Sequence, residues 1–174
     1  MSGKTARASA LDMKWRVQGM IVDERIVTFI NSLDTRNSDL LEAVEAEARA
    51  ADVPIIRREM QSFLKVLLLM HKPGSILEVG TAVGFSALLM SEAVSGECHI
   101  TTIENYGKRI PVARENFRRA EKEEQITLIE GDALEVMRKL DGPYDFIFMD
   151  AAKGQYIHYL PDAMRLLGEG GVLV

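Results

Sequence analysis

A glycine-containing turn is the first feature of the sequence that could bind a cofactor. It reads Glu78-Val-Gly-Thr-Ala-Val-Gly-Phe-Ser86 and follows a short apolar run. Glycines in such a turn let the backbone fold tightly and approach a ligand at the start of the next helix. Ala82 breaks both the GxGxxG and the GxGxG pattern, and the absence of a following Gly-Lys-Ser or Gly-Lys-Thr argues against a phosphate-binding P-loop. Taken alone, the turn fits a cofactor site and an ordinary strand-to-helix connection about equally well.

The next two apolar runs end in acidic residues. Glu104 lies 24 residues after Gly80, where a carboxylate can accept hydrogen bonds from both hydroxyls of a ribose. The third run ends in Glu130-Gly-Asp132-Ala133, which could present a carboxylate and a backbone N–H to the edge of an adenine. Asp132 is equally suited to cap a helix. Glu104 by itself could be a solvated residue, but beside the glycine turn the ribose interpretation is the better one.

The fourth apolar run, 144–150, delivers Asp150 and is followed by Lys153. Carboxylate oxygens are the ligands that Mg²⁺ and Ca²⁺ prefer, so Asp150 is a candidate cation ligand, with an ordering role in the loop as the alternative. A lysine at such a position is usually a solvated charge. In a crevice beside a cation, however, Lys153 could act as a general base.

From Ser75 onward, short apolar runs alternate with helical patterns. The sequence predicts strands over 75–80, 99–104, 125–130, 144–150 and 171–174, and helices over 85–95, 108–122, 133–140 and 161–167. This alternation predicts an α/β fold with a doubly wound, mostly parallel sheet. Ligands of such sheets bind beyond the carboxyl ends of the strands, which is where the candidate residues lie.

A layer of helices is expected before the first strand. Residues 21–70 show helical spacing that predicts three helices, with Asn37 and Ser38 able to cap the second and Asp52-Val-Pro54 ending it before the third. This layer is where we expect one wall of the ligand site. The small, basic residues 1–20 predict a flexible arm, so the expected organisation is an arm over 1–20 and one domain over 21–174.

Composition narrows the class of protein. The chain has 174 residues, of which 47% are hydrophobic, and a formal net charge of −5, values typical of a globular domain and without a global basic field for nucleic acid. No apolar run approaches the length needed to cross a bilayer. No secretory signal pattern opens the sequence, and Cys98 has no intrachain partner, so we expect a cytoplasmic protein.

Taken together, four segments resemble the cation-dependent O-methyltransferases of the caffeoyl-CoA and catechol type. These are Ile76–Ser86, Thr102–Glu104, Glu130–Ala133 and Phe148–Tyr156. The likeness is greatest to small bacterial members, one branch of which methylates a hydroxyuridine of tRNA, and it extends from about 21 to 174. It implies a Rossmann-like methyltransferase fold, S-adenosylmethionine as cofactor, a divalent cation, and a homodimer.

The resemblance also implies a role for each candidate residue. Glu78, Gly80, Thr81 and Ser86 would surround the methionine part of the cofactor, Glu104 would bind the ribose, and Asp132 with Ala133 would bind the adenine. Asp150 would hold the cation beside the cofactor, and Lys153 would take the proton of the acceptor hydroxyl. The hydroxyl oxygen would then attack the sulfonium methyl group in line.

One departure from the family pattern occurs at the end of the sequence. The chain stops at Val174, inside the fifth predicted strand, whereas family members continue into an Asp-Asn pair that completes the metal site and into two further strands. The resemblance therefore predicts a domain that lacks its C-terminal strands. Asp150 would then be a single carboxylate ligand, too few for a dedicated cation site.

Three classes of function remain open at this point. The first is an O-methyltransferase acting on a small aromatic hydroxyl compound, a phenylpropanoid thioester or tRNA, and the second is a cofactor-binding module without catalysis. A nicotinamide-dependent oxidoreductase is third, because it shares the glycine turn and the acidic Glu104 but requires a GxGxxG pattern that is missing here.

Overall fold

The computed structural model describes residues 23–94 and 96–174, which fall into two parts, 23–35 and Arg36–Val174. The first part contains helix α2 (Glu24–Ser32), whose N-terminus is capped by Asp23. The predicted arm over 1–20 lies outside the described residues, so the division into arm and domain stays a prediction. Within the described residues, no helix has the length and apolar character to cross a membrane.

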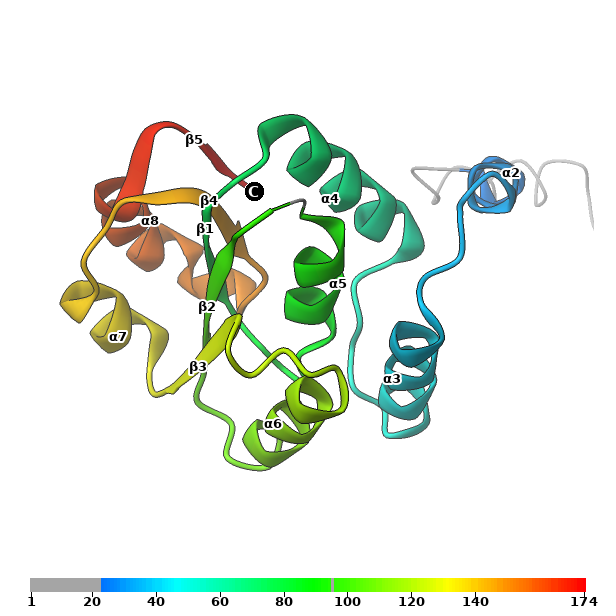
Figure 1. Ribbon diagram of the computed structural model, residues 1–174, viewed down its shortest axis with the longest axis horizontal. Coiled ribbons are helices and arrows are strands. Elements are labelled where there is room, and N and C mark those ends of the chain that lie inside the picture. The colour runs from blue at the N-terminus through cyan, green and yellow to red at the C-terminus, as the bar shows by residue number, and fades with distance from the viewer. Residues whose placement is uncertain (1–22, 95) are drawn as a thin grey trace, which may run out of the picture. The chain divides into compact units, whose positions relative to one another are not determined.

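A sheet of five parallel strands forms the centre of the second part (Figure 1). The strands are β1 (Ser75–Val79), β2 (His99–Glu104), β3 (Ile126–Glu130), β4 (Tyr144–Met149) and β5 (Leu167–Leu173), in the spatial order β3-β2-β1-β4-β5. The chain winds outward from β1 to β3 and then returns to place β4 on the other side of β1. The predicted doubly wound parallel sheet is therefore confirmed, with its switch point between β1 and β4.

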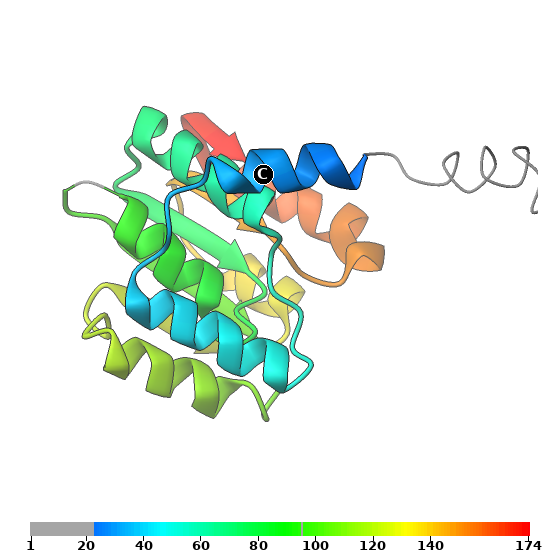
Figure 2. The same ribbon diagram turned by 90° about the vertical axis from the view of Figure 1, so that its right-hand side faces the viewer.

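Helices cover both faces of this sheet (Figures 1 and 2). They are α3 (Asp39–Ala50), α4 (Arg58–His71), α5 (Phe85–Ala93), α6 (Ile110–Arg119), α7 (Ala133–Lys139), the 3₁₀ turn η1 (Lys153–Gln155) and α8 (Tyr156–Leu166). Helices α3 to α6 pack on one face and α7 with α8 on the other, so two separate clusters of buried side chains form. Along β1, Ile76 belongs to the first cluster, and Leu77 and Val79 to the second.

Local signals explain where the helices of the N-terminal layer begin and end. The Ser38 hydroxyl accepts a hydrogen bond from the Leu41 N–H and caps α3, as predicted. The segment with Pro54 separates α3 from α4, because a residue ahead of proline is disfavoured in the helical conformation. Leu41 and Leu64, from these two helices, are almost wholly buried in the first cluster.

The C-terminal elements differ from the prediction. Helix α8 begins at Tyr156, well before Pro161, and contains that proline, whereas the prediction used proline as a helix start. Strand β5 begins at Leu167, four residues earlier than expected. Its pairing with β4 shifts register between Tyr144 and Phe146. This irregularity lets a glycine-rich segment of low strand propensity join the sheet.

Candidate functional site

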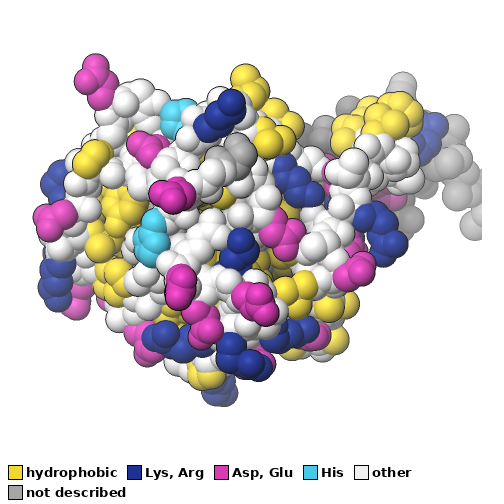
Figure 3. Space-filling model, viewed as in Figure 1, with side chains coloured by type: hydrophobic (Ala, Val, Ile, Leu, Met, Phe, Trp, Pro, Cys, Tyr) yellow, Lys and Arg dark blue, Asp and Glu magenta, His cyan; other side chains and the backbone are white. Residues whose placement is uncertain are grey.

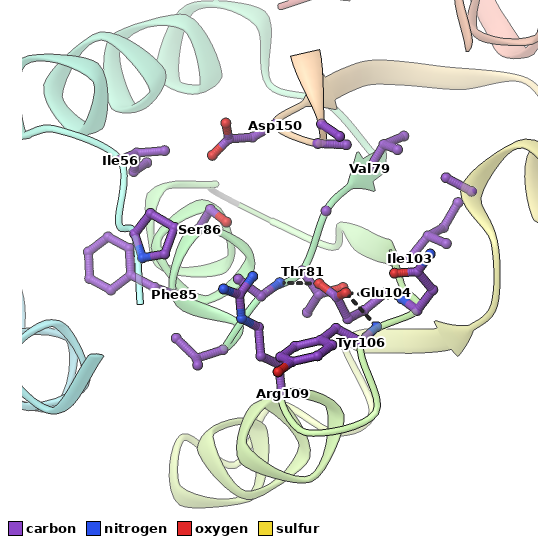
Figure 4. Close-up of a pocket in the computed structure, with 18 of the residues that line it drawn as sticks. Ile56, Val79, Thr81, Phe85, Ser86, Ile103, Glu104, Tyr106, Arg109 and Asp150 are labelled. Atoms are coloured by element: carbon purple, nitrogen blue, oxygen red, sulfur yellow. Dashed lines mark hydrogen bonds between the residues drawn. The ribbon is translucent and has the colours of Figure 1, made fainter. Parts of the chain in front are cut away.

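A cavity of about 750 Å³ opens at the carboxyl ends of the strands, next to the switch point (Figure 4). It is the kind of place where parallel α/β sheets bind ligands. It is lined by the turn after β1, the ends of β2, β3 and β4, the connection between α3 and α4, and Tyr159 of α8. Of the predicted site residues, Gly80, Thr81, Ser86, Glu104, Ala133 and Asp150 all contribute to the lining.

The glycine turn has a backbone that only small residues can follow. Gly80 has a φ of +107°, and a Cβ there would lie 2.5 Å from the carbonyl oxygen of Asp150. Gly84 has a φ of +83°, and a Cβ would lie 2.5 Å from the Phe117 ring. Ala82 also adopts a left-handed conformation, with a φ of 48°. The residue that breaks the glycine pattern therefore keeps the conformation that glycine would favour, at some cost in backbone strain.

Backbone N–H groups fix the carboxylate of Glu104 at the end of β2. One oxygen accepts from the Ala82 N–H at 2.7 Å, and the other accepts from the N–H groups of Tyr106 at 2.8 Å and Asn105 at 3.0 Å. Each carboxylate oxygen has two lone pairs, so capacity for further donors remains. Glu104 therefore couples the glycine turn to β2 and faces the cavity as an oriented acceptor (Figure 4).

A planar pair of side chains lies beside Glu104. The Arg109 guanidinium stacks over the Tyr106 ring, 5.3 Å from its centroid, and both residues line the cavity (Figure 4). Arginine stacked on an aromatic ring gains a cation–π interaction and keeps its hydrogen-bond donors available. Sequence reasoning did not identify either residue. The available signal was their position shortly after Glu104, the predicted ribose ligand.

Behind the glycine turn lies a chain of four buried polar side chains. Ser86 Oγ donates to one oxygen of Glu78, and Thr102 Oγ1 donates to the other at 2.5 Å. The hydroxyls of Thr102 and Thr81 are 2.6 Å apart. Glu78 is 0% exposed, and burial is the main reason why its pKa is raised to about 7, with smaller contributions from the charges of Asp150 and Glu104.

Only two of these four hydrogen-bonded side chains reach the cavity. Thr81 and Ser86 line the cavity, whereas Glu78 and Thr102 are not among the lining residues. Glu78 therefore lies one layer behind the wall. Thr102 was not predicted as a site residue, although parallel register places it beside Glu78 on the neighbouring strand.

At the end of β3, Asp132 and Ala133 have different positions. The Asp132 carboxylate accepts from the N–H groups of Leu134 at 3.0 Å and Glu135 at 3.3 Å, so it caps α7. Ala133 lines the cavity together with Gly131, and Asp132 is not among the lining residues. Asp132 therefore caps a helix, as one of the two sequence interpretations predicted. That it also binds the adenine stays a prediction.

The end of β4 brings Asp150 into the cavity, where its side chain points toward Ile56 in Figure 4. The Asp150 N–H donates to the Val79 carbonyl at 3.0 Å, which holds the end of β4 against β1. Lys153 begins η1 just beyond, and the position of its side chain lies outside what the structure describes. Nearby, the Tyr156 hydroxyl donates to the Met149 carbonyl, and burial together with the Asp150 charge raises the pKa of Tyr156.

The donor set at Asp150 does not by itself fit a divalent cation. Mg²⁺ and Ca²⁺ take six or more oxygen ligands, several of them usually carboxylates. Across 23–94 and 96–174, no three His, Cys, Asp or Glu residues gather where they could hold a metal ion. Asp150 is thus the only predicted metal ligand among these residues.

One wall of the cavity comes from the N-terminal helical layer. That the acceptor binds against this wall stays a prediction. Pro54, Ile55, Ile56 and Arg57 precede α4, and Met60 lies in its first turn. Except for Arg57, this wall is apolar, and it lies opposite the glycine turn and Glu104 (Figure 4). The cavity therefore has a polar side that suits a nucleoside and an apolar side that suits a flat organic molecule.

Comparison with known proteins identifies the family. Residues 32–174 match the O-methyltransferase family. The chain is also 32% identical over 149 residues to a catechol O-methyltransferase from Mycobacterium tuberculosis, covering 84% of this chain and 68% of that protein. The chain belongs to the O-methyltransferase family.

Solved structures of O-methyltransferases share the fold. A methyltransferase from Podospora anserina, solved with SAH bound, superposes with a TM-score of 0.81 at 28% identity, covering 86% of this O-methyltransferase and 67% of that chain. A putative caffeoyl-CoA O-methyltransferase from Staphylococcus aureus gives a TM-score of 0.78 at 34% identity, covering 87% and 72%. The Rossmann-like methyltransferase fold is thus confirmed. For several other O-methyltransferases, the match spans between 43% and 62% of the relative's length.

Proposed function

We propose that this O-methyltransferase moves the methyl group of S-adenosylmethionine to a hydroxyl of a small aromatic acceptor of the catechol type. The observation that carries the proposal is the cavity at the switch point, with an oriented Glu104 on one side and an apolar wall on the other. Structural neighbours solved with SAH bound support the choice of cofactor. The names of curated relatives support the class of acceptor.

The cofactor would lie across the carboxyl ends of β1 to β3. Glu104 accepts hydrogen bonds from the ribose hydroxyls, because its carboxylate is already oriented by three backbone N–H groups. Gly80, Thr81 and Ser86 contact the methionine part, with Glu78 behind them. The adenine lies toward Ala133, whose backbone follows the cap of α7 at Asp132.

The reaction is an in-line displacement at carbon. An oxygen lone pair of the acceptor forms the new O–CH₃ bond while the S–CH₃ bond breaks, and the bonding electrons return to sulfur, so the sulfonium becomes a neutral thioether. Lys153, which follows the cavity residue Asp150 in the chain, takes the acceptor hydroxyl proton in its neutral amine form and becomes an ammonium. Holding the two reactants in line within one cavity supplies a large part of the rate enhancement.

The cation expected from the family has a limited place in this mechanism. When bound, a divalent cation would polarise the acceptor oxygen and ease loss of its proton. Asp150 is the described residue that could contribute to holding it.

The apolar wall favours a planar acceptor over a large polar one. Pro54, Ile56 and Met60 offer no charge to a phosphate backbone, and Arg57 is the one cationic residue of this wall. The net charge of −5 gives no general attraction to nucleic acid. A small aromatic acceptor is therefore the first candidate. A tRNA hydroxyuridine acceptor, a homodimer and a cytoplasmic location stay predictions.

Methyl transfer to catechol tests this proposal. The purified chain is incubated with methyl-labelled S-adenosylmethionine and catechol, with and without Mg²⁺, and the methylated product is quantified. We expect product from the wild type and from the control Lys139→Met, an exposed lysine at the end of α7. Loss of a general base usually lowers the rate about 10²-fold or more, which is the expected result for Lys153→Met. Full activity in Lys153→Met would contradict the role of that lysine, and no product from a chain that binds S-adenosylhomocysteine would contradict the acceptor class.

A further inference from the structure

The apolar wall of the cavity belongs to a segment without secondary structure, 53–57, and few hydrogen bonds hold its backbone. At its start, the Val53 N–H donates to a carbonyl in the last turn of α3 at 2.9 Å. At its end, the Arg57 carbonyl accepts from the Gln61 N–H at 2.9 Å. Among the described residues, one further hydrogen bond reaches the backbone between these two points. It comes from the side chain of Gln61, whose Nε2 donates to the Ile56 carbonyl at 3.0 Å.

Gln61 is a polar side chain in a buried position, with 1% of its surface exposed. A buried amide costs free energy unless its donors and its acceptor are used. Here Nε2 donates to the Ile56 carbonyl, and Oε1 accepts from Asn37 Nδ2 at 2.9 Å. Gln61 is not among the residues that line the cavity. Its amide therefore serves the backbone of the wall rather than a ligand.

Three hydrogen bonds in series connect Lys65 of α4 to the wall, and their direction is fixed at both ends. The Lys65 ammonium can only donate, and it donates to Asn37 Oδ1. The Ile56 carbonyl can only accept. Asn37 must therefore turn its Nδ2 toward Gln61, and Gln61 must turn its Nε2 toward Ile56. Flipping either amide would place donors against donors and acceptors against acceptors.

Charged groups hold Asn37 in its place beside α4. Its backbone N–H donates to Glu42 Oε1 at 3.3 Å, and Glu42 Oε2 accepts from Arg58 at 2.9 Å. Arg58, in the first turn of α4, also lies 3.5 Å from a carboxylate oxygen of the buried Glu45. Helix α3 and the start of α4 are thus joined by ion pairs directly next to the wall.

We infer that Gln61 is a positioning residue for the apolar wall, and that Asn37 and Lys65 act through it. Its amide holds the Ile56 carbonyl and thereby keeps the wall where it completes the cavity. This inference rests on the proposed function, in which the acceptor lies against this wall. It adds three residues from outside the cavity lining to those that determine how well an acceptor binds.

Loss of the Gln61 amide should populate states in which the wall has left its place. The Ile56 carbonyl then lacks its partner and is better satisfied by turning toward water. An acceptor that needs the wall binds only the molecules in which the wall is in place, so its apparent affinity falls with their fraction. The rate at saturating acceptor should change little, because a bound acceptor restores the wall.

Two measurements on Gln61→Leu test the inference. Amide hydrogen exchange reports the wall itself, through the hydrogen-bonded amides of Val53 and of position 61. We expect both to exchange about fivefold or more faster than in the wild type, while amides of β1 change little. Methyl transfer to catechol reports the consequence. The KM for catechol should rise about fivefold or more, the size of one lost hydrogen bond, while kcat and the affinity for S-adenosylhomocysteine stay within about twofold.

Further variants separate positioning from general damage to the fold. Lys65→Arg keeps a donor for Asn37 and should behave like the wild type, whereas Lys65→Met should raise the KM for catechol. If Asn37 acts through Gln61, Asn37→Ala raises this KM by itself but changes it less than about twofold in the Gln61→Leu background. Additive effects of the two changes would overturn the inference, and so would wild-type exchange and KM in Gln61→Leu. Should Gln61→Leu fail to fold, Asn37→Ala alone is the second variant, with the same expected and contrary results.

The two measurements also distinguish this inference from the proposed function. A wild type that binds S-adenosylhomocysteine but does not methylate catechol overturns the proposed acceptor class. Hydrogen exchange then decides the inference: faster exchange in Gln61→Leu supports the positioning of the wall, and unchanged exchange overturns it. If Gln61→Leu weakens S-adenosylhomocysteine as much as catechol, the wall is not specific to the acceptor, and the inference is overturned while the cofactor assignment stands.

Discussion

Ionisation of the buried Glu78 should make the stability of the fold depend on pH. The pKa of Glu78 is about 7 in the folded protein against 4.5 as the reference, a difference equivalent to about 3 kcal/mol. Because the folded state binds the proton more tightly than the unfolded state, this stabilisation is fully present below pH ~4.5 and is lost as pH rises through about 7. Above that range, the folded protein holds a carboxylate whose burial is opposed by desolvation.

The variant Glu78→Gln isolates this effect, since glutamine has a similar shape and does not ionise. Between pH 5 and pH 8.5 the free energy of unfolding of the wild type should fall by about 2.5 kcal/mol relative to that of the variant. This is most of the total of about 3 kcal/mol. Urea unfolding without cofactor at several pH values gives the free energy of unfolding of both proteins. Glu124→Gln, which changes an exposed glutamate, is the control and should follow the wild type.

A flat difference between the wild type and Glu78→Gln across this pH range would refute the reasoning. It would mean that Glu78 titrates near 4.5 in the fold, and that two hydroxyl donors outweigh its burial. If Glu124→Gln departs from the wild type with pH as much as Glu78→Gln does, the pH dependence does not come from Glu78.

Three further changes test other parts of the structure. Gly80→Ala introduces a Cβ 2.5 Å from the Asp150 carbonyl at a φ of +107°, so calorimetry should show a loss of S-adenosylhomocysteine affinity of about tenfold or more, and affinity like that of the wild type would contradict the tight turn. Ser38→Ala removes the cap of α3 and should lower the free energy of unfolding in urea by about 1 kcal/mol; no change would show that the cap contributes little. Leu64→Ala empties a wholly buried position and should cost about 2–5 kcal/mol in the same measurement, with a loss below 1 kcal/mol contradicting the packing of α4 against the sheet.

Much of the sheet could be predicted because its strands are short apolar runs between clear breaks. The bounds of β2 agree with the prediction, and those of β1, β3 and β4 differ by one residue. The position of the cavity followed from topology, since parallel strands bring their carboxyl ends to one edge. Gly80, Glu104 and Asp150 therefore came together as expected, although they are far apart in the sequence.

The parts that escaped prediction depend on tertiary contacts. Proline at the expected helix start lies inside α8, because the helix begins from η1, and the glycines of β5 are accommodated by a shift in register against β4. Thr102 meets Glu78 only through the register of the two neighbouring strands, which brings its hydroxyl to the buried carboxylate. Tyr106 and Arg109 line the cavity because the end of β2 lies against the glycine turn, which is a tertiary contact.

Calorimetric titration with S-adenosylhomocysteine tests most directly whether the cavity binds the cofactor through Glu104. The experiment compares the wild type with Glu104→Ala and with Glu124→Ala, an exposed glutamate away from the cavity. We expect the wild type and Glu124→Ala to bind, and Glu104→Ala to bind at least about tenfold more weakly, because hydrogen bonds to a charged group are lost. Equal binding by Glu104→Ala, or no binding by a folded wild type, would contradict the assignment of this cavity.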